Sequence, residues 1–315
     1  MSVETSVMCG GLSLRGPIMP ASGTFSFEMD AVLDISKLAA LVLKTTTLHG
    51  RQGNPVPRVA ETAKGMLNSI GLPGAGIESF LSVELPKYRS FGPPVIASIS
   101  GDTVAQFGEM VALIDAAGVS AIELNISCPN IEADGQAFAM SPAATAGVVK
   151  AARSRTNLPL WAKLTPNTGI IAEIAEAAEA AGADAVVVAN TMLALAIDTD
   201  SREPMLGNVM GGLSGPAIKP IILRMVYQCS RRVSIPVIGC GGVSSGRDAV
   251  EYLLAGASAV QVGTESFLDP TALERIETEL IEYCDERGIG SVAALVGAVR
   301  DENASAGSLD TDIAP

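Results

Sequence analysis

The stretch LPLWAKLTPNTGIIAEIAEAAEAAGADAVVVAN, residues 158–190, decides the fold of this chain. An apolar run opens it, a segment with helical periodicity follows over residues 170–181, and a second apolar run comes after a glycine turn. Two apolar runs that flank a helical segment are typical of two parallel strands joined by a crossover helix. Because the runs are apolar at nearly every position, we expect the strands to be buried on both faces.

The same unit recurs along the chain. Helical periodicity is also present over residues 105–117, 142–155 and 247–255. Apolar runs rich in Val, Ile and Leu give eight predicted strands: residues 17–23, 39–46, 94–100, 121–127, 158–165, 184–190, 236–241 and 258–263. Eight strand–helix units predict an α/β fold, a closed TIM (β/α)8 barrel.

Three segments fall outside this repeat. Residues 7–17 resemble a hairpin with its turn at Gly10–Gly11 or Arg15–Gly16, and we expect it to close the bottom of the barrel. Two long excursions, residues 49–93 and 191–216, follow strands at their carboxyl ends. Catalytic loops of TIM barrels lie at that end, so both excursions are expected to be functional.

The composition limits the class of protein. Of the 315 residues, 48% are hydrophobic and 17% are charged, which predicts one globular barrel domain over residues 1–300 and a disordered acidic tail, DENASAGSLDTDIAP, over 301–315. The net charge of −13 argues against a nucleic-acid partner. The sequence contains no run of about eighteen apolar residues and no basic-then-apolar amino terminus, so we expect a soluble, cytoplasmic protein without membrane contact.

Cysteine and histidine usage excludes further chemistry. The five cysteines, at positions 9, 128, 229, 240 and 284, form no C-x-x-C pair, and His49 is the only histidine. We therefore expect neither disulfides, nor a bound metal, nor a Ser-His-Asp triad. Cys128 directly follows the predicted strand that ends in ELNIS, which makes its thiol the best candidate for a catalytic base. The other four cysteines are expected to be small buried hydrophobes.

Polar residues and glycines stand where the predicted strands end. Because the carboxyl ends of all eight strands meet at one mouth, we expect these residues to form the site: Ser22, Lys44, Ser98, Asn125, Lys163, Asn190, Gly241, Gly242 and Gly263. At the last two strands, GCGG at 239–242, Gly263-Thr264 and the helix start at 244–248 can present backbone N–H groups to a phosphate. The alternative is that these glycines serve only tight turns.

Two lysines stand at strand ends. Lys163 lies in the apolar run WAKLTP, where a buried ammonium must be compensated. An anionic cofactor edge such as that of a reduced flavin, a Schiff base with a carbonyl substrate, or a structural ion pair would each do so. Lys44, together with amides at positions 68, 125, 130 and 190, suits a flat, amide-bearing, carboxylated ligand.

Motifs from residue 19 to residue 264 resemble those of class 1 dihydroorotate dehydrogenases, in the same order. They are MPASGTF (19–25), GNPVPR (53–58), GMLNSIGLPG (65–74), ELNISCPN (123–130), AKLTPN (162–167), NT (190–191), GGLSGPAIKP (211–220), GCGG (239–242) and AVQVGT (259–264). The resemblance implies a barrel that binds flavin mononucleotide (FMN). It also implies a cysteine that takes a proton from C5 of dihydroorotate while hydride passes from C6 to flavin N5.

The resemblance assigns a role to each matching position. Cys128 falls on the base and Lys163 on the lysine that stabilises the flavin. The implied flavin contacts are Ser22, Lys44, Thr45, Ser98, Asn125, Lys163, Gly215, Gly241, Gly242, Gly263 and Thr264. The expected substrate contacts are Lys44, Asn68, Ser69, Ile70, Gly71, Leu72, Asn125, Asn130, Asn190 and Thr191.

Within class 1, GMLNSIGL, KTTTL and GGLSGPAIKPIILRMVYQ look more like the NAD-linked subclass. That subclass implies a partner subunit that carries FAD and an iron–sulfur cluster, and a homodimer of the catalytic chain is also expected. A homodimer that reduces fumarate is the second choice. The serine base and membrane-associating extension of class 2 are absent from this sequence.

The sequence also departs from the family pattern. Ser98 stands where Asn is usual, Thr45 replaces a smaller residue, and Ala139 and Ala194 stand where loops usually have Gly. A paralogue that acts on another dihydropyrimidine is therefore an alternative. From other classes, a Schiff-base lyase that uses Lys163 and a non-catalytic flavin-binding barrel remain open.

Overall fold

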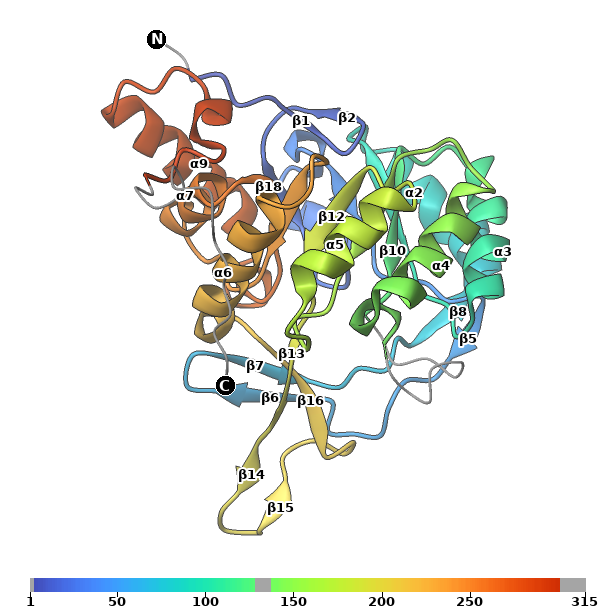
Figure 1. Ribbon diagram of the computed structural model, residues 1–315. Coiled ribbons are helices and arrows are strands. Elements are labelled where there is room, and N and C mark those ends of the chain that lie inside the picture. Colours follow the sequence, from blue (N-terminus) through green and yellow to red (C-terminus); the bar gives the residue numbers. More distant parts are fainter. Residues whose placement is uncertain (1–2, 128–136, 301–315) are drawn as a thin grey trace.

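The computed structural model describes residues 3–127 and 137–300. Its main sheet has eight parallel strands, and the end strands β3 and β4 lie next to each other, so that the sheet curves into a barrel (Figure 1). In spatial order the strands are β3 (Ile18–Pro20), β18 (Ala257–Val262), β17 (Val237–Cys240), β12 (Ala185–Val188), β11 (Leu160–Lys163), β10 (Ala121–Asn125), β9 (Val95–Ile99) and β4 (Leu41–Val42). Each coincides with a predicted run, β18 beginning one residue earlier, and the TIM-barrel prediction is confirmed.

Helices surround the barrel (Figure 1). They are α1 (Ile77–Ser79), α2 (Leu85–Arg89), α3 (Val104–Asp115), α4 (Pro142–Arg153), α5 (Ile171–Ala180), α6 (Lys219–Ser230), α7 (Gly246–Leu254), α8 (Glu265–Leu268) and α9 (Ala272–Glu286). A π-helical segment, Phe80–Glu84, joins α1 to α2. The hydroxyls of Thr103, Ser141 and Ser245 cap α3, α4 and α7 by accepting a backbone N–H from the first turn, which fixes where these helices begin.

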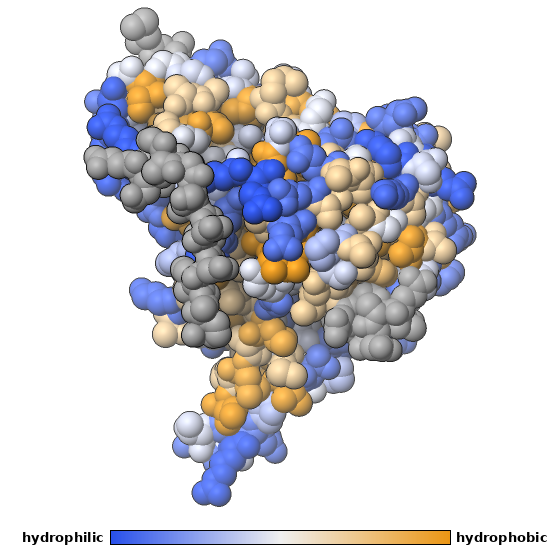
Figure 2. All heavy atoms as spheres, in the orientation of Figure 1, coloured by the Kyte–Doolittle hydropathy of each residue, from blue (hydrophilic) through white to orange (hydrophobic). Residues whose placement is uncertain are grey.

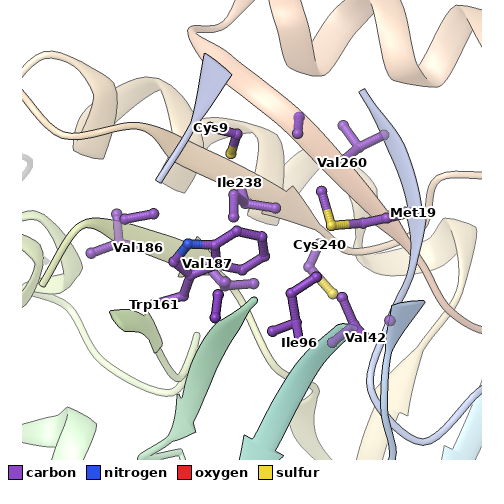
Figure 3. Close-up of a cluster of buried hydrophobic side chains, with 14 of the residues drawn as sticks. Cys9, Met19, Val42, Ile96, Trp161, Val186, Val187, Ile238, Cys240 and Val260 are labelled. Atoms are coloured by element: carbon purple, nitrogen blue, oxygen red, sulfur yellow. The ribbon is translucent and has the colours of Figure 1, made fainter. Parts of the chain in front are cut away.

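Apolar side chains fill the interior of the barrel. Figure 3 shows Met19, Ile96, Trp161 and Ile238 pointing toward one another from four different strands, and all four are buried. This packing leaves no room for a pore through the barrel.

The amino-terminal hairpin covers one end of the barrel. Strands β1 (Val7–Cys9) and β2 (Leu12–Leu14) pair antiparallel around Gly10–Gly11, the first of the two predicted turns. The indole N–H of Trp161, near the start of β11, donates to the carbonyl oxygen of Gly10 at 2.9 Å. The hairpin thus closes the amino end of the strands, as expected. Cys9, Cys229, Cys240 and Cys284 are all buried, also as expected.

The two excursions, predicted as long loops, pair with each other. They form a four-stranded antiparallel sheet in the order β13-β16-β7-β6, here called the mouth sheet. Its strands are β6 (Val59–Thr62), β7 (Gly65–Asn68), β13 (Met192–Leu195) and β16 (Met210–Ser214). Two short pairs extend it: β5 (His49–Arg51) with β8 (Gly74–Gly76), and β14 (Ile197–Asp198) with β15 (Glu203–Pro204). The mouth sheet lies at the opposite end of the barrel from the hairpin (Figure 1).

Among residues 3–127 and 137–300, no helix has both the length and the apolar character needed to cross a membrane.

We predict that Gly10→Ala destabilises the protein strongly. A Cβ at Gly10 would lie 2.2 Å from Nε1 of Trp161 and 2.8 Å from Cβ of Ala185. Since overpacking typically costs about 1–3 kcal/mol in addition to about 1–2 kcal/mol for a left-handed backbone, urea unfolding should show a loss of roughly 2–5 kcal/mol.

The matched control is Gly288→Ala, because Gly288 also has a positive φ (65°) but no atom within 4 Å of the added Cβ. This variant should lose only the backbone contribution. Equal losses in the two variants would contradict the assignment of the hairpin turn as a tightly packed plug.

Candidate functional site

The predicted polar residues gather at the carboxyl end of the barrel. Asn125 and Lys163 end β10 and β11, and Ser98 lies in β9 one residue before that strand ends. The remaining predicted residues at this end follow β3, β4, β12, β17 or β18: Ser22, Lys44, Thr45, Asn190, Gly241, Gly242, Gly263 and Thr264. Cys128 and Asn130 lie outside the described residues.

A chain of hydrogen bonds crosses the mouth. The Asn190 amide donates to the hydroxyl oxygen of Ser127 at 2.5 Å, and the Ser127 hydroxyl donates to Oδ1 of Asn125 at 2.5 Å. Asn125 Nδ2 donates to Thr45 Oγ1 at 3.2 Å, which in turn lies 2.8 Å from Ser98 Oγ. Residues from four separate parts of the sequence are thus held in one polar layer.

The series of hydrogen bonds continues into the barrel interior, to a buried carboxylate. Ser98 Oγ donates to Oε1 of Glu123 at 3.0 Å, and Gln261 Nε2 donates to Oε2 of the same carboxylate at 2.7 Å. Because the Ser98 hydroxyl has one hydrogen and gives it to Glu123, the Thr45 hydroxyl donates to Ser98. The two departures from the family pattern, Thr45 and Ser98, are therefore neighbours that share one hydrogen bond.

Lys163 meets the same buried cluster. Its ammonium donates to Gln261 Oε1 at 3.0 Å and lies 3.5 Å from Ser22 Oγ and 3.8 Å from Glu123 Oε1. Only 3% of Lys163 and none of Glu123 is exposed. Sequence reasoning missed Glu123 and Gln261, although the signal used for Lys163, a polar residue inside an apolar strand, is present in AIELN and AVQVGT.

Glycines that follow β16, β17 and β18 form a narrow cradle at the carboxyl end of the barrel, the end at which Lys163 finishes β11. A Cβ at Gly242 would lie 2.7 Å from the Gly215 carbonyl oxygen, and one at Gly215 would lie 2.7 Å from Gly65 Cα. Within the part of the chain that the structure describes, the backbone N–H groups of Gly242, Gly263 and Thr264 donate to no protein group. Such N–H groups can bind an anion.

Two N–H groups at the start of α7 are not available to this cradle. Ser244 N–H donates to Asp248 Oδ2 at 2.9 Å, and Gly246 N–H donates to Glu279 Oε2 at 2.6 Å. The expectation that the helix start at 244–248 faces an anion is therefore wrong for these two groups, because protein carboxylates already occupy them. Burial opposes ionisation of Asp248, but hydrogen bonds from Lys219 and Ser244 hold its pKa below the usual value.

The loop after β7 is braced toward the mouth. Lys44 Nζ donates to the carbonyl oxygen of Pro73, and Asn54 Nδ2 donates to Ser69 Oγ at 2.7 Å. Gly71 and Leu72 both have positive φ, 77° and 50°, so this loop turns sharply. The predicted substrate residues Asn68, Ser69, Ile70, Gly71 and Leu72 all belong to it or to the end of β7.

Asn68 and Thr191 connect this loop to the rest of the mouth. Asn68 Nδ2 donates to the carbonyl oxygen of Gly212 on β16 at 3.3 Å, and the Thr191 backbone N–H donates to Asn190 Oδ1 at 2.8 Å. The mouth sheet thereby joins the predicted substrate loop to the strand ends.

Apolar side chains are exposed on the mouth sheet and on its extensions. Figure 2 shows an apolar area over the part of the molecule that carries β13 and β16. The exposed apolar residues in this region are Val56, Val59, Leu193, Leu195, Ile197, Met205, Val209 and Met210. A cavity of about 310 Å³ opens beside them and is lined mainly by apolar side chains, among them Leu67, Leu195 and Leu213.

Comparison with known proteins agrees with this geometry. A family model described as dihydroorotate dehydrogenase matches residues 4–284. This chain belongs to the dihydroorotate dehydrogenase family. The resemblance inferred from the motifs is therefore confirmed.

Similar proteins are named "Dihydroorotate dehydrogenase B (NAD(+)), catalytic subunit". One from Geobacter sp. (strain M21) is 46% identical over 299 residues, 94% of this chain and 98% of that protein. One from Trichlorobacter lovleyi is 47% identical over 302 residues, 95% of this chain and 99% of that protein. One from Desulforudis audaxviator is 46% identical over 301 residues, with 95% and 98% covered. The family likeness thus covers nearly the whole chain.

We predict that Asp248→Asn destabilises the protein by about 1–3 kcal/mol near neutral pH, because it removes a charge that binds Lys219 and Ser244. Because folding lowers the pKa of Asp248, its charge contributes to the free energy of unfolding. This contribution is fully present above the pKa of an unfolded aspartate, about 3.9, and is lost as pH falls through the lower pKa of the folded protein. In urea unfolding, the difference in free energy of unfolding between wild type and variant should therefore be constant above about pH 5 and should become smaller below about pH 4.

Glu251→Gln is the control, because Glu251 contacts the same lysine from the surface with 46% of its side chain exposed. Its effect should stay below about 1 kcal/mol. A difference for Asp248→Asn that does not change on acidification would contradict the role given to its charge.

Proposed function

We propose that this chain oxidises dihydroorotate to orotate, a step of pyrimidine synthesis, with FMN bound at the mouth of the barrel. The observation that carries the proposal is a buried Lys163 ammonium and a glycine cradle at the same end of the barrel, in a chain of this family.

The residues present fit FMN. Gly242, Gly263 and Thr264 offer backbone N–H groups for its phosphate, and the absence of a side chain at Gly215 lets the ligand approach the backbone. The sequence contains no G-x-G-x-x-G turn between a strand and a helix, so a mononucleotide suits the chain better than a dinucleotide. FMN, when bound, supplies a hydride acceptor.

Lys163 would stabilise negative charge at the cofactor edge. Its position as the last residue of β11, next to Ser22 and Gln261, keeps the ammonium inside the barrel and out of water. A charge in such a water-poor place acts more strongly on a developing anion than an exposed charge would. We assign Ser22, Thr45, Ser98, Asn125 and the cradle to the cofactor as well.

The substrate would lie between the amide layer and the loop after β7. Asn125 and Asn190 are already oriented by Ser127, and amides of this kind can pair with the ring amides of a dihydropyrimidine. Lys44 reaches the same loop and offers a cation for the substrate carboxylate. Asn68, Ser69, Ile70, Gly71, Leu72, Asn130 and Thr191 complete the proposed substrate set.

Cys128 is the proposed base. It directly follows Ser127 in the sequence. The Ser127 hydroxyl donates a hydrogen bond to Asn125 and accepts one from Asn190, so the residue that precedes Cys128 belongs to the polar layer. In this role the thiolate takes the proton from C5. Another dihydropyrimidine is the alternative substrate, and the hydrogen-bonded Thr45 and Ser98 are the observation that favours it. The lyase alternative does not agree with the family.

We propose that the electrons leave through a second polypeptide. The relatives are named as catalytic subunits of an NAD(+) enzyme, and the cysteines of this chain lack the spacing for an iron–sulfur cluster. The apolar residues exposed on the mouth sheet support an assembly in which this surface is covered, with the catalytic chain as a homodimer. Cytoplasmic location remains part of the same proposal.

Cofactor release and one substitution test the reaction. Acid treatment of the purified protein should release FMN, and anaerobic dihydroorotate should bleach the flavin absorption. Cys128→Ala should keep the flavin and slow its reduction by about 10²–10⁴-fold, because only the base is removed. Cys284→Ala is the matched control, since Cys284 is also a buried cysteine but lies on the outer helix α9, away from the strand ends. Release of FAD, or undiminished flavin reduction by Cys128→Ala, would contradict the proposal.

The purified chain should transfer electrons from dihydroorotate to dyes but not to NAD. One flavin-sized site cannot also bind a dinucleotide, so NAD reduction should appear only after a subunit with FAD and an iron–sulfur cluster is added. Steady-state assays with and without that subunit make the comparison. Efficient NAD reduction by the chain alone refutes the two-subunit arrangement, and efficient fumarate reduction indicates the homodimeric subclass.

A further inference from the structure

Glu123 is a carboxylate with no exposed surface, in the middle of the apolar strand β10. Removing a carboxylate from water costs several kcal/mol unless it is paired and hydrogen-bonded. Its neighbours supply both kinds of contact, since Ser98 and Gln261 donate hydrogen bonds and Lys163 supplies the positive charge. The arrangement is therefore a built site and not an accident of packing.

Gln261 connects the carboxylate to the lysine. Its amide has one donor end and one acceptor end. Because Glu123 accepts from Nε2 at 2.7 Å, Oε1 must face the other way, where it accepts from Lys163 at 3.0 Å. The direct distance between Lys163 Nζ and Glu123 Oε1 is 3.8 Å, so the charges attract without a short contact between them.

We propose that Glu123 is a positioning residue that keeps Lys163 protonated and fixes its direction through Gln261. The carboxylate lies two residues before the strand-end residue Asn125 in β10, and it contacts Lys163 and Ser98, two residues assigned to the cofactor, so it acts on the site through them. Its effect on the flavin rests on the proposed function, whereas its effect on the protonation of Lys163 does not.

Charged and neutral groups of the described residues face Lys163 from the surrounding strands. Glu123 on β10 and Cys240 on β17 are the ionisable ones among the described residues, and Gln261 on β18 and Ser22 after β3 are neutral. Burial raises the pKa of the Cys240 thiol, and the positive charge of Lys163 opposes that rise.

Glu123→Gln tests this, because it keeps the shape and removes the charge. Without the carboxylate, the buried ammonium should lose its proton between about pH 6 and 10. As pH rises through that range, the midpoint potential of the flavin bound to the variant should then fall further than that of the wild type, because the neutral lysine no longer stabilises the reduced form. This additional fall is called the extra step. A tenfold change in the two-electron equilibrium would appear as 29.6 mV.

Three variants serve as controls. Glu123→Asp retains the charge and should show no extra step, whereas Glu123→Gln combined with Lys163→Gln should lose the step because the titrating group is gone. Glu123→Gln combined with Cys240→Ser should keep it, which excludes the thiol as its source. If Glu123→Gln does not fold, Gln261→Leu removes the connecting amide and should give a smaller step of the same sign.

Stability measurements test the same inference without reference to flavin. In Glu123→Gln the unfolded chain would bind a proton on Lys163 that the folded chain has lost, so stability should rise with pH relative to wild type. The largest slope is tenfold in the unfolding constant per pH unit, about 1.4 kcal/mol.

The two measurements separate the two proposals. If the stability of Glu123→Gln rises with pH as expected but the purified protein contains no flavin, the proposed function is overturned and the role of Glu123 is retained. Bound flavin, with wild-type pH dependence of both potential and stability in Glu123→Gln, would overturn the role of Glu123.

Discussion

The buried ammonium of Lys163 is the constraint on which the rest of the mouth depends. A cation that is 3% exposed inside a barrel needs compensation, and the chain provides it from neighbouring strands rather than from water. Glu123, Gln261 and Ser98 satisfy this requirement, and each then needs a partner of its own. The hydrogen bonds therefore extend from the barrel interior through Thr45 and Asn125 to the strand ends.

This constraint divides the barrel into two levels. Below the lysine, the hairpin and apolar side chains such as Trp161 and Met19 close the interior. Above it, polar side chains and the glycine cradle face the mouth, and the mouth sheet extends beyond them. Rigid packing below gives the polar level a fixed base, which a site that orients a flat ligand requires.

Much of the site could be found from the sequence, because β/α periodicity fixes which residues end a strand. Lys163, Asn125 and Ser98 were placed at the mouth by that reasoning alone, and the structure has them there. Glu123 and Gln261 were missed because attention to strand ends passes over polar residues deeper in a strand. The occupied start of α7 was also missed, since Glu279, which binds Gly246 N–H, is 33 residues away in sequence.

The sequence by itself determined the barrel, its eight strands, the amino-terminal hairpin, without choosing between its two candidate turns, and the family. Each of these depends on local periodicity or on motifs that can be read in order along the chain. Only the tertiary structure decided that the two excursions pair as one sheet. The strands β7 and β16 are about 145 residues apart, and each also pairs with a strand close to it in sequence, β6 or β13, so the local pattern gives no sign of the contact between them. It also decided that Lys163 faces Glu123 through Gln261, since a closed barrel brings β10, β11 and β18 around one interior, and burial there makes their polar groups depend on one another.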